Sequence, residues 1–267
     1  MEPWKTAVVG IVQGLTEFLP VSSSAHIVFA ERLLHLNGQG LELTVIVHFG
    51  TLVAVVVAMW YRIVPIVQGT LGGVVKLTHG ASPWDDEHFR WGAFIVLATI
   101  PAAVVGVMFE RQVSAAFGDP RMVSGLLLVT GTLLFTTRFA PQPGRDLRWW
   151  SALAVGLAQA VAILPGISRS GSTIATGLFC GIDRRKAVEF SFLLSIPIIL
   201  GPSLLTIGEI VARFQAANAV PLAVGCVVSG MTGYVAVRLL IGFVQRRGLT
   251  WFAYYCWAVG LVGLLIF

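Results

Sequence analysis

The chain has 267 residues, of which 56% are apolar and only 12% are charged, whereas a soluble domain carries about 25% charged residues. Several apolar runs exceed the ~18 residues that mark a membrane-spanning helix, and they cover 41–61, 91–109 and 221–244. This composition excludes a soluble enzyme, a nucleic-acid-binding protein and a secreted disulfide scaffold. The class predicted is an all-α, polytopic membrane protein, in which the net charge of +5 lies mainly in loops.

Apolar runs and helix breakers predict the elements of the first half. A helix over 5–18 is too short to span and is broken by Pro20 and the serines at 22–24, after which a second short helix covers 24–36. Spanning helices are expected over 41–62, 89–109 and 121–138. The segment 63–88 contains three acidic residues near its end, and it is expected to be an interfacial or aqueous loop.

The second half predicts the same order of elements. Short helices over 148–163 and 171–181 are separated by Leu164-Pro165-Gly166. Spanning helices are then expected over 185–212, 219–244 and 250–267, the first of them kinked by its two prolines. The order of a broken pair followed by three spans therefore occurs twice.

Sequence matches support an internal duplication. Gly10 and Gln13 precede Leu19-Pro20 and the serines, and Gly156 and Gln159 precede Leu164-Pro165 and Ser168-Arg169-Ser170. Two such matches in register, about 146 residues apart, indicate a repeat, with halves of about 1–140 and 141–267 in a single transmembrane domain. Because each half has an odd number of spans, the second half must be inverted, as in many transporters. We therefore expect six spanning helices and two re-entrant helix-loop-helix pairs that face each other.

The distribution of Lys and Arg predicts the orientation of the chain. Basic residues are concentrated in loops on one face, for example at Arg184, Arg185 and Lys186, and the more basic face is cytoplasmic. Both termini and the mouth of the first broken pair are then expected on the outer side.

Glu17 is the first candidate site residue, because a charge at membrane depth costs about 3 kcal/mol on insertion scales. Gln13 lies four residues earlier on the same helical face. A carboxylate and an amide oxygen could hold a divalent cation with help from phosphate oxygens. The alternative is a structural role, in which Glu17 bonds to backbone N–H groups at a helix end.

The serines at 22–24 and His26 follow directly. A hydroxyl beside an imidazole and a carboxylate supplies a nucleophile and a base, although a serine cluster at a broken helix could also only satisfy freed backbone groups. His48 lies within a spanning segment and is expected to be a packed or polar-bridging residue, with a role in the site as the alternative. Cys180, Cys226 and Cys256 match no metal or redox spacing and are expected to pack.

Arg169 occupies the second break, between Ser168 and Ser170. A guanidinium group, serine hydroxyls and free N–H groups at a helix start are suited to bind phosphate. The alternative is a structural salt bridge from Arg169 to Glu17 across the repeat interface, and the two interpretations are compatible in a resting state.

Two long motifs resemble those of one family. Gln13-Gly-Leu-Thr-Glu17-Phe-Leu-Pro-Val-Ser22-Ser23-Ser24-Ala25-His26 and Pro165-Gly-Ile-Ser168-Arg169-Ser170-Gly-Ser-Thr173 resemble the signatures of bacterial undecaprenyl pyrophosphate phosphatase, the bacitracin-resistance family. The resemblance covers essentially the whole chain. It implies a multi-pass enzyme of the bacterial inner membrane that removes the terminal phosphate from undecaprenyl pyrophosphate and so recycles the lipid carrier for peptidoglycan. It also implies a homodimer, dependence on a divalent cation, and an active site that opens outward.

The resemblance also assigns roles to residues. Glu17, Ser23, His26 and Arg169 would be catalytic, Glu17 and Gln13 would hold Mg²⁺ or Ca²⁺, and the substrate-binding residues would be Ser22, Ser24, Ser168, Ser170 and Thr173. Ser23 assisted by His26 is the expected nucleophile, with attack by water or by His26 left open. Two departures matter, since Gln13 stands where Glu is common and Ala25 where Gly is common. The alternative function is a transporter or flippase of an anionic lipid or small anion, which would not require Ser23 and His26 beside Glu17.

Overall fold

The computed structural model describes residues 1–36, 40–141, 144–213 and 216–267, and within these ranges the regular elements are helices apart from one isolated bridge between Arg145 and Ile182. The helices of the first half are α1 (Pro3–Phe18), α2 (Ser23–Leu33), α3 (Gly40–Ala58), α4 (Trp60–Thr78), α5 (Glu87–Met108), α6 (Glu110–Phe117), α7 (Pro120–Thr136) and the 3₁₀ turn η1 (Thr137–Phe139). Those of the second half are α8 (Trp149–Val161), α9 (Arg169–Phe179), α10 (Arg184–Arg213), η2 (Ala216–Asn218), α11 (Ala219–Arg247) and α12 (Thr250–Ile266).

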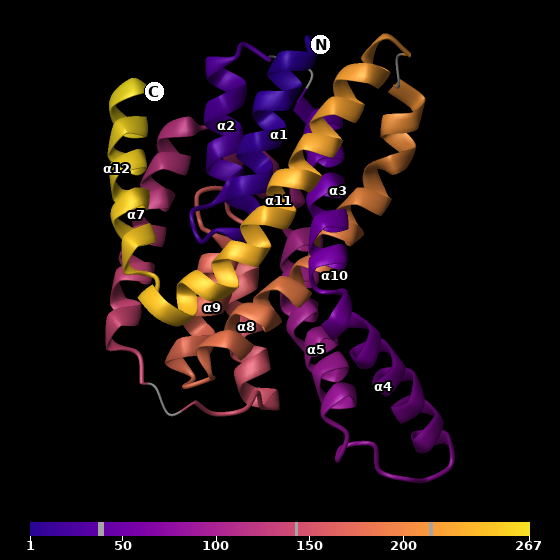
Figure 1. Ribbon diagram of the computed structural model, residues 1–267. Helices are drawn as coiled ribbons and strands as arrows, with labels where there is room; N and C mark the ends of the chain where they lie inside the picture. The colour runs from indigo at the N-terminus through magenta and orange to yellow at the C-terminus, as the bar shows by residue number, and fades with distance from the viewer. Residues whose placement is uncertain (37–39, 142–143, 214–215) are drawn as a thin grey trace.

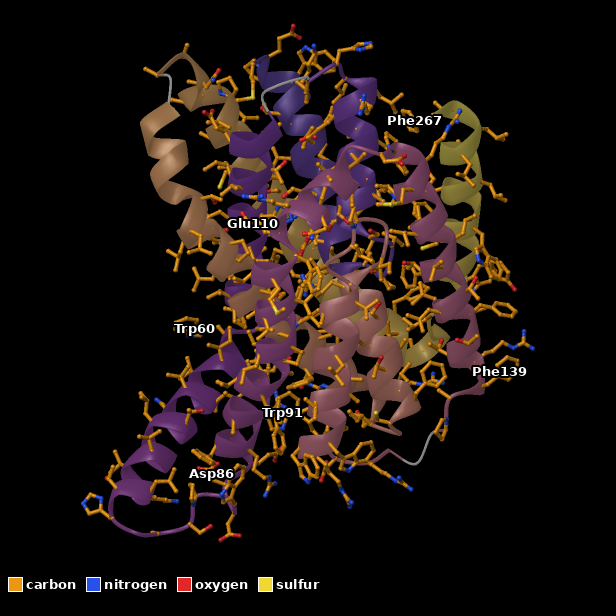
Figure 2. All side chains as sticks on the ribbon, turned by 180° about the vertical axis from the view of Figure 1, so that it is seen from behind. Trp60, Asp86, Trp91, Glu110, Phe139 and Phe267 are labelled. Atoms are coloured by element: carbon orange, nitrogen blue, oxygen red, sulfur yellow. The ribbon has the colours of Figure 1, made fainter. Side chains whose placement is uncertain are left out.

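The apolar helices confirm the class predicted from composition. Within the described residues, four stretches are long and apolar enough to cross a membrane, Glu87–Met108, Pro120–Phe139, Arg184–Thr206 and Ala216–Val244. The pair formed by Glu42–Ala58 and Trp60–Thr78, which bends by 80°, meets the same criterion only when its two helices are taken together. Trp60 lies at the surface where that bend occurs (Figure 2).

The prediction of a loop over 63–88 is wrong for most of its length, because α4 occupies Trp60–Thr78. Pro65 and three glycines resemble breakers in the sequence, but the helix packs against α5. A Cβ at Gly73 would come within 2.0 Å of the Phe89 ring, so this glycine is what lets the two helices approach. The tip of the α4–α5 hairpin projects from the other helices, and Asp86 lies near it (Figures 1 and 2).

The two broken pairs approach each other from opposite ends of the molecule. In Figure 1, α1 and α2 occupy the upper part and α8 and α9 the lower part, and both chain termini lie at the upper end. The break in each pair lies close to the middle of the molecule. There the chain turns back after Phe18 in the first pair and after Val161 in the second (Figure 1). The breaks are therefore placed where they can form a common site.

The first helix of each pair packs against a spanning helix of the other half. Helix α1 lies along α11, and a Cβ at Gly10 would be 2.7 Å from the carbonyl oxygen of Gly225. Helix α8 lies along α5, and a Cβ at Gly156 would be 2.6 Å from the carbonyl oxygen of Ala98. Gly10 and Gly156 hold equivalent places in the repeated motif, and each allows a backbone approach that a side chain would block.

The buried core surrounds the breaks with aromatic and aliphatic side chains. Phe18, directly after Glu17, meets Phe192 of α10 edge to face, with ring centroids 5.5 Å apart, and both side chains are fully buried. Such aromatic pairs add about 1 kcal/mol beyond the area they bury. This contact fixes the end of α1 against α10 and thereby the position of Glu17.

Candidate active site

The two breaks are joined by serine hydroxyls. Ser170 Oγ donates a hydrogen bond to the Leu19 carbonyl oxygen at 2.9 Å, and the Gly166 N–H donates to Ser24 Oγ at 3.4 Å. A backbone that leaves a helix inside a membrane protein must find partners for its polar groups within the protein. Each break supplies a serine to the backbone of the other, so the two breaks hold one another in place.

A serine also caps the helix that follows each break. Ser22 Oγ accepts from the Ala25 N–H at 3.5 Å, and Ser168 Oγ accepts from the Gly171 N–H at 3.0 Å. Ser22 has φ 66°, a left-handed conformation that is uncommon for a residue with a side chain. Conformations of this kind cost about 1–3 kcal/mol and persist where surrounding contacts impose them.

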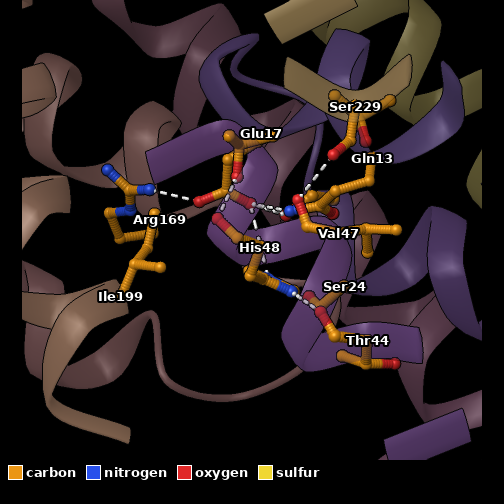
Figure 3. Close-up of polar contacts among 12 residues, drawn as sticks. Gln13, Glu17, Ser24, Thr44, Val47, His48, Arg169, Ile199 and Ser229 are labelled. Carbon is orange, nitrogen blue, oxygen red and sulfur yellow. Dashed lines mark hydrogen bonds and ion pairs between the residues drawn. The ribbon is translucent and has the colours of Figure 1, made fainter. Parts of the chain in front are cut away.

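The carboxylate of Glu17 lies at the centre of the polar contacts (Figure 3). Arg169 Nη2 is 2.5 Å from Glu17 Oε1, so the salt bridge considered from the sequence is present. Ser23 Oγ donates to Glu17 Oε2 at 2.7 Å, and Gln13 Nε2 donates to the same oxygen at 3.0 Å. The structure thus brings together a carboxylate, a guanidinium, a hydroxyl and an amide from the two halves of the chain.

His48 is a further member of this cluster, which the sequence analysis gave a role in the site only as the alternative. Its Nε2 lies 3.7 Å from Glu17 Oε2, and its Nδ1 lies 2.7 Å from the Thr44 carbonyl oxygen (Figure 3). The sequence signal was weak, because a single histidine in an apolar span is more often a packed residue than a site residue. The free-energy cost of placing a polar group at membrane depth was the one sign in the sequence that His48 belongs to a site.

The Glu17–Arg169 pair is buried. The side chain of Glu17 is 6% exposed and that of Arg169 is 12% exposed. A buried pair must recover a desolvation cost of several kcal/mol per ion through close geometry and further hydrogen bonds, which Ser23 and Gln13 provide.

A cavity of about 440 Å³ adjoins the pair and has two kinds of lining. We call it the active-site cavity. Its polar end includes Glu17, Arg169, His48 and the serines at 22–24. Its apolar side is formed by side chains from four regions of the chain, Ala102, Phe117, Ile163, Ile167, Ile198 and Ile199. The volume lies within the range of ~300–1,000 Å³ found for small-molecule sites.

Several of the expected site residues do not line this cavity. Ser168 caps α9, Ser170 bonds to Leu19, and Thr173 Oγ1 lies 2.6 Å from Ser191 Oγ of α10. Their hydroxyls hold the second break together instead of facing the cavity. Of the residues expected to bind phosphate, the cavity receives Arg169 from the second break and Ser22 and Ser24 from the first.

His26 is not brought to Ser23. Its Nδ1 lies 2.8 Å from the carbonyl oxygen of Ser22, and its Nε2 lies 2.8 Å from the hydroxyl of Tyr255 on α12. Both ring nitrogens are therefore engaged, and the hydrogen-bond partner of Ser23 is Glu17. The expected assistance of Ser23 by His26 has no counterpart in this geometry.

The apolar helices and the buried polar cluster together define a class, a polytopic helical membrane protein with a cavity that is charged at one end and apolar along one side. Comparison with protein families narrows this class. The model described as bacitracin resistance protein BacA matches residues 6–262, and the chain belongs to this family.

Individual relatives agree with the family match. The undecaprenyl-diphosphatase of Salinibacter ruber is 37% identical, covering 98% of this chain and 98% of that protein. The undecaprenyl-diphosphatases of Methanobrevibacter smithii and Korarchaeum cryptofilum are each 39% identical over 98% of this chain, and the matches cover 96% and 98% of those proteins. The resemblance found in the two sequence motifs is thereby confirmed.

Proposed function

We propose that this protein hydrolyses undecaprenyl diphosphate to undecaprenyl phosphate and inorganic phosphate, and so recycles the lipid carrier for wall synthesis. The observation that carries the proposal is the contact of Arg169 and Ser23 with the two oxygens of Glu17, at the polar end of a cavity that also has an apolar side. The printed names of the relatives agree with it. Transport of an anion would not need a hydroxyl beside the buried carboxylate.

The active-site cavity suits a substrate with a charged head and an isoprenoid tail. The diphosphate would lie against Arg169 and the serines of the first break. The tail would follow the apolar lining between α10, α5 and α6, where Ile199 and Ala102 contribute. That route reaches the lipid through helices with exposed apolar faces, for example at Val104 and Leu205.

The contacts of Arg169 and Ser23 with Glu17 support a two-step reaction. The guanidinium of Arg169 exchanges Glu17 for the diphosphate and stabilises charge on the phosphoryl group being transferred. Ser23 Oγ attacks the terminal phosphorus while its proton passes to the released Glu17, and the bond from phosphorus to the bridging oxygen breaks. Undecaprenyl phosphate leaves, and water then hydrolyses the phosphoserine to phosphate. Direct attack by water oriented by Glu17 is the competing route.

A divalent cation forms part of the proposal. Gln13 Oε1 is buried and has no hydrogen-bond partner, and it lies on the residue that bonds to Glu17. An amide oxygen and a carboxylate are ligands that Mg²⁺ and Ca²⁺ accept, but the described residues contain no cluster of three acidic, His or Cys groups. The cation would therefore depend on diphosphate oxygens, and when bound it would neutralise charge on them.

The finer features of the architecture also remain proposals. We propose an inverted repeat with six spanning helices and two re-entrant pairs, supported by the reciprocal packing of α1 on α11 and α8 on α5. The positions of both termini at one end (Figure 1) support an even number of crossings, and the basic loops at the other end favour an outward-facing site. A homodimer is a prediction that still requires a test.

The function is tested with purified protein in detergent and undecaprenyl diphosphate. We expect release of inorganic phosphate that depends on Mg²⁺ or Ca²⁺, and a loss of about 10²-fold or more in kcat for Ser23→Ala, because the variant lacks the attacking hydroxyl. Acid quenching should trap a phosphoserine in the wild type only. The matched control is Ser203→Ala, which removes a cavity-lining hydroxyl on α10 far along the chain from Glu17.

One outcome would contradict hydrolysis, and another would change only the identity of the attacking group. Absence of phosphate release by the wild type, combined with movement of an anion or lipid across vesicles, would favour the transporter. Full activity in Ser23→Ala would leave hydrolysis intact but assign the attack to water.

The cation is tested at Gln13. Replacement of Gln13 by Glu adds a second carboxylate beside Glu17, and we expect the cation concentration for half-maximal phosphate release to fall by about tenfold, since ligand charge sets the affinity for hard cations. Gln13→Leu should raise it. Gln159→Glu is the control, because Gln159 lines the same cavity but bonds to the Ala98 carbonyl and not to Glu17. An unchanged requirement in Gln13→Glu would remove Gln13 from the cation site.

A further inference from the structure

Helix α12 contacts the first break and the start of the helix that follows it. The Tyr255 hydroxyl lies 2.8 Å from His26 Nε2, and the two rings stack with centroids 5.6 Å apart at an interplanar angle of 7°. The neighbouring Cys256 thiol donates a weak hydrogen bond to the Pro20 carbonyl oxygen at 3.7 Å. Two consecutive residues of α12 thus contact the chain on either side of Ser23, at Pro20 before it and at His26 after it.

The contacts of His26 fix its tautomer. A carbonyl oxygen only accepts, so the Nδ1 that lies 2.8 Å from the Ser22 carbonyl must carry the hydrogen. In the neutral ring Nε2 is then the acceptor, and the Tyr255 hydroxyl donates to it. The lone pair that a general base would use is already occupied in this arrangement.

The chain of hydrogen bonds ends on the strained residue of the break. Ser22 has φ 66° and ψ 90°, and its carbonyl oxygen receives both the His26 side chain and the His26 backbone N–H. A fixed carbonyl at Ser22 fixes the peptide plane that leads to Ser23. Ser23 is the residue whose hydroxyl reaches Glu17.

We propose that Tyr255 is a positioning residue, which acts through the Nδ1–H tautomer of His26 to hold the Ser22 turn and so aim Ser23 at Glu17. The inference rests on the proposed function and adds to it an element from the last helix of the chain. It gives His26 a positioning role through its Nδ1–H, in place of the role of proton acceptor for Ser23.

The first variant is Tyr255→Phe, which keeps the ring that stacks on His26 and removes only the hydroxyl. We expect kcat for phosphate release to fall by about fivefold to tenfold, the rate equivalent of one hydrogen bond, with KM unchanged because Arg169 is untouched. Tyr254→Phe is the matched control, since the Tyr254 ring packs among Phe135, Trp251 and Trp257, away from His26. The midpoint of thermal unfolding is measured for each variant in the same detergent, so that a fall in kcat can be distinguished from a loss of stability.

The second pair of variants separates positioning from base catalysis. The amide nitrogen of Asn can occupy the place of His Nδ1, whereas that of Gln can occupy the place of Nε2. We expect His26→Asn to keep at least tenfold more activity than His26→Gln, with the pH profile of kcat unchanged in shape. Adding Tyr255→Phe to His26→Asn should cause no further loss, because the link to Ser22 no longer passes through the ring.

The outcomes are decisive in both directions. Tyr255→Phe with wild-type kcat, or His26→Asn as inactive as His26→Gln, would overturn the positioning role. Loss of the acidic limb of the pH profile in His26→Asn would make His26 the base. A wild-type protein that releases no phosphate would instead overturn the proposed function, so the two failures are distinguishable.

Discussion

Glu17→Gln is expected to reduce kcat for phosphate release by about 10²–10⁴-fold, the range that a positioned base contributes. The substitution keeps the shape of the side chain and its contact with Gln13, but the amide cannot take the Ser23 proton. It also leaves the Arg169 guanidinium, 12% exposed, without its counter-charge. Removal of one partner of a buried ion pair costs about 3 kcal/mol or more, so the thermal midpoint should fall as well.

A double variant separates the chemical effect from the structural one. Glu17→Gln combined with Arg169→Met removes both charges and keeps similar volume, and such replacements are neutral or stabilising in other proteins. We expect the thermal midpoint to recover while activity stays absent. Glu189→Gln is the control carboxylate, because Glu189 is equally buried and paired with Arg62 and Arg185 in a separate cluster. It should lower stability and leave kcat of the folded protein within about threefold of wild type, as expected for a group that contacts no reacting atom. Recovery of activity in the double variant would contradict the role given to Glu17.

Arg169→Ala is expected to produce the second large effect, a loss of about 10³-fold or more in kcat, in line with arginines that stabilise a transferring phosphoryl group. Affinity for the diphosphate should fall too. Among the described residues, Arg169 is the Arg or Lys side chain that lines the cavity. Arg169→Lys keeps the charge but lacks the planar fork that binds two oxygens at once. It should recover only part of the loss. Single-turnover measurements separate binding from the chemical step.

The control for Arg169 is an exposed arginine of the first broken pair. Arg32, in the last turn of α2, donates to the Gly118 carbonyl at 3.1 Å and does not line the cavity. Arg32→Ala changes the net charge equally and should leave kcat unaltered. Activity above a tenth of wild type in Arg169→Ala would show that the guanidinium is not needed in the transition state.

Much of the site was predictable because charge is expensive in an apolar chain. Glu17 and Arg169 stand at paired helix breaks, and the cost of placing either in a membrane identified them as candidate site residues, with a salt bridge between them as the alternative interpretation. The directions of the hydroxyl groups were not predictable in this way. Whether Ser170 faces a cavity or the Leu19 carbonyl depends on how the two breaks dock, and spacing along one chain does not encode that.

His26 and α4 show two other limits. His26 lies three residues from Ser23, so proximity suggested a working pair, but its ring turns toward Tyr255, which lies 229 residues away. For α4, the sequence analysis placed a loop over 63–88, where Pro65 and three glycines give no clear sign of a helix. Tertiary packing reversed that expectation, since Gly73 is buried beneath Phe89 and the glycines that weaken an isolated helix allow a close helix pair.

The serine bonds that cross between the breaks make catalysis depend on the docking of the two halves. Neither half contains both Glu17 and Arg169, and the distance between these groups is set by Ser24 against Gly166 and Ser170 against Leu19. A small slide of one half against the other would separate the carboxylate from the guanidinium while each helix stayed intact. Bilayer thickness acts on the tilt and offset of spanning helices. A change in bilayer thickness should therefore lower kcat before it lowers the helical content of the protein.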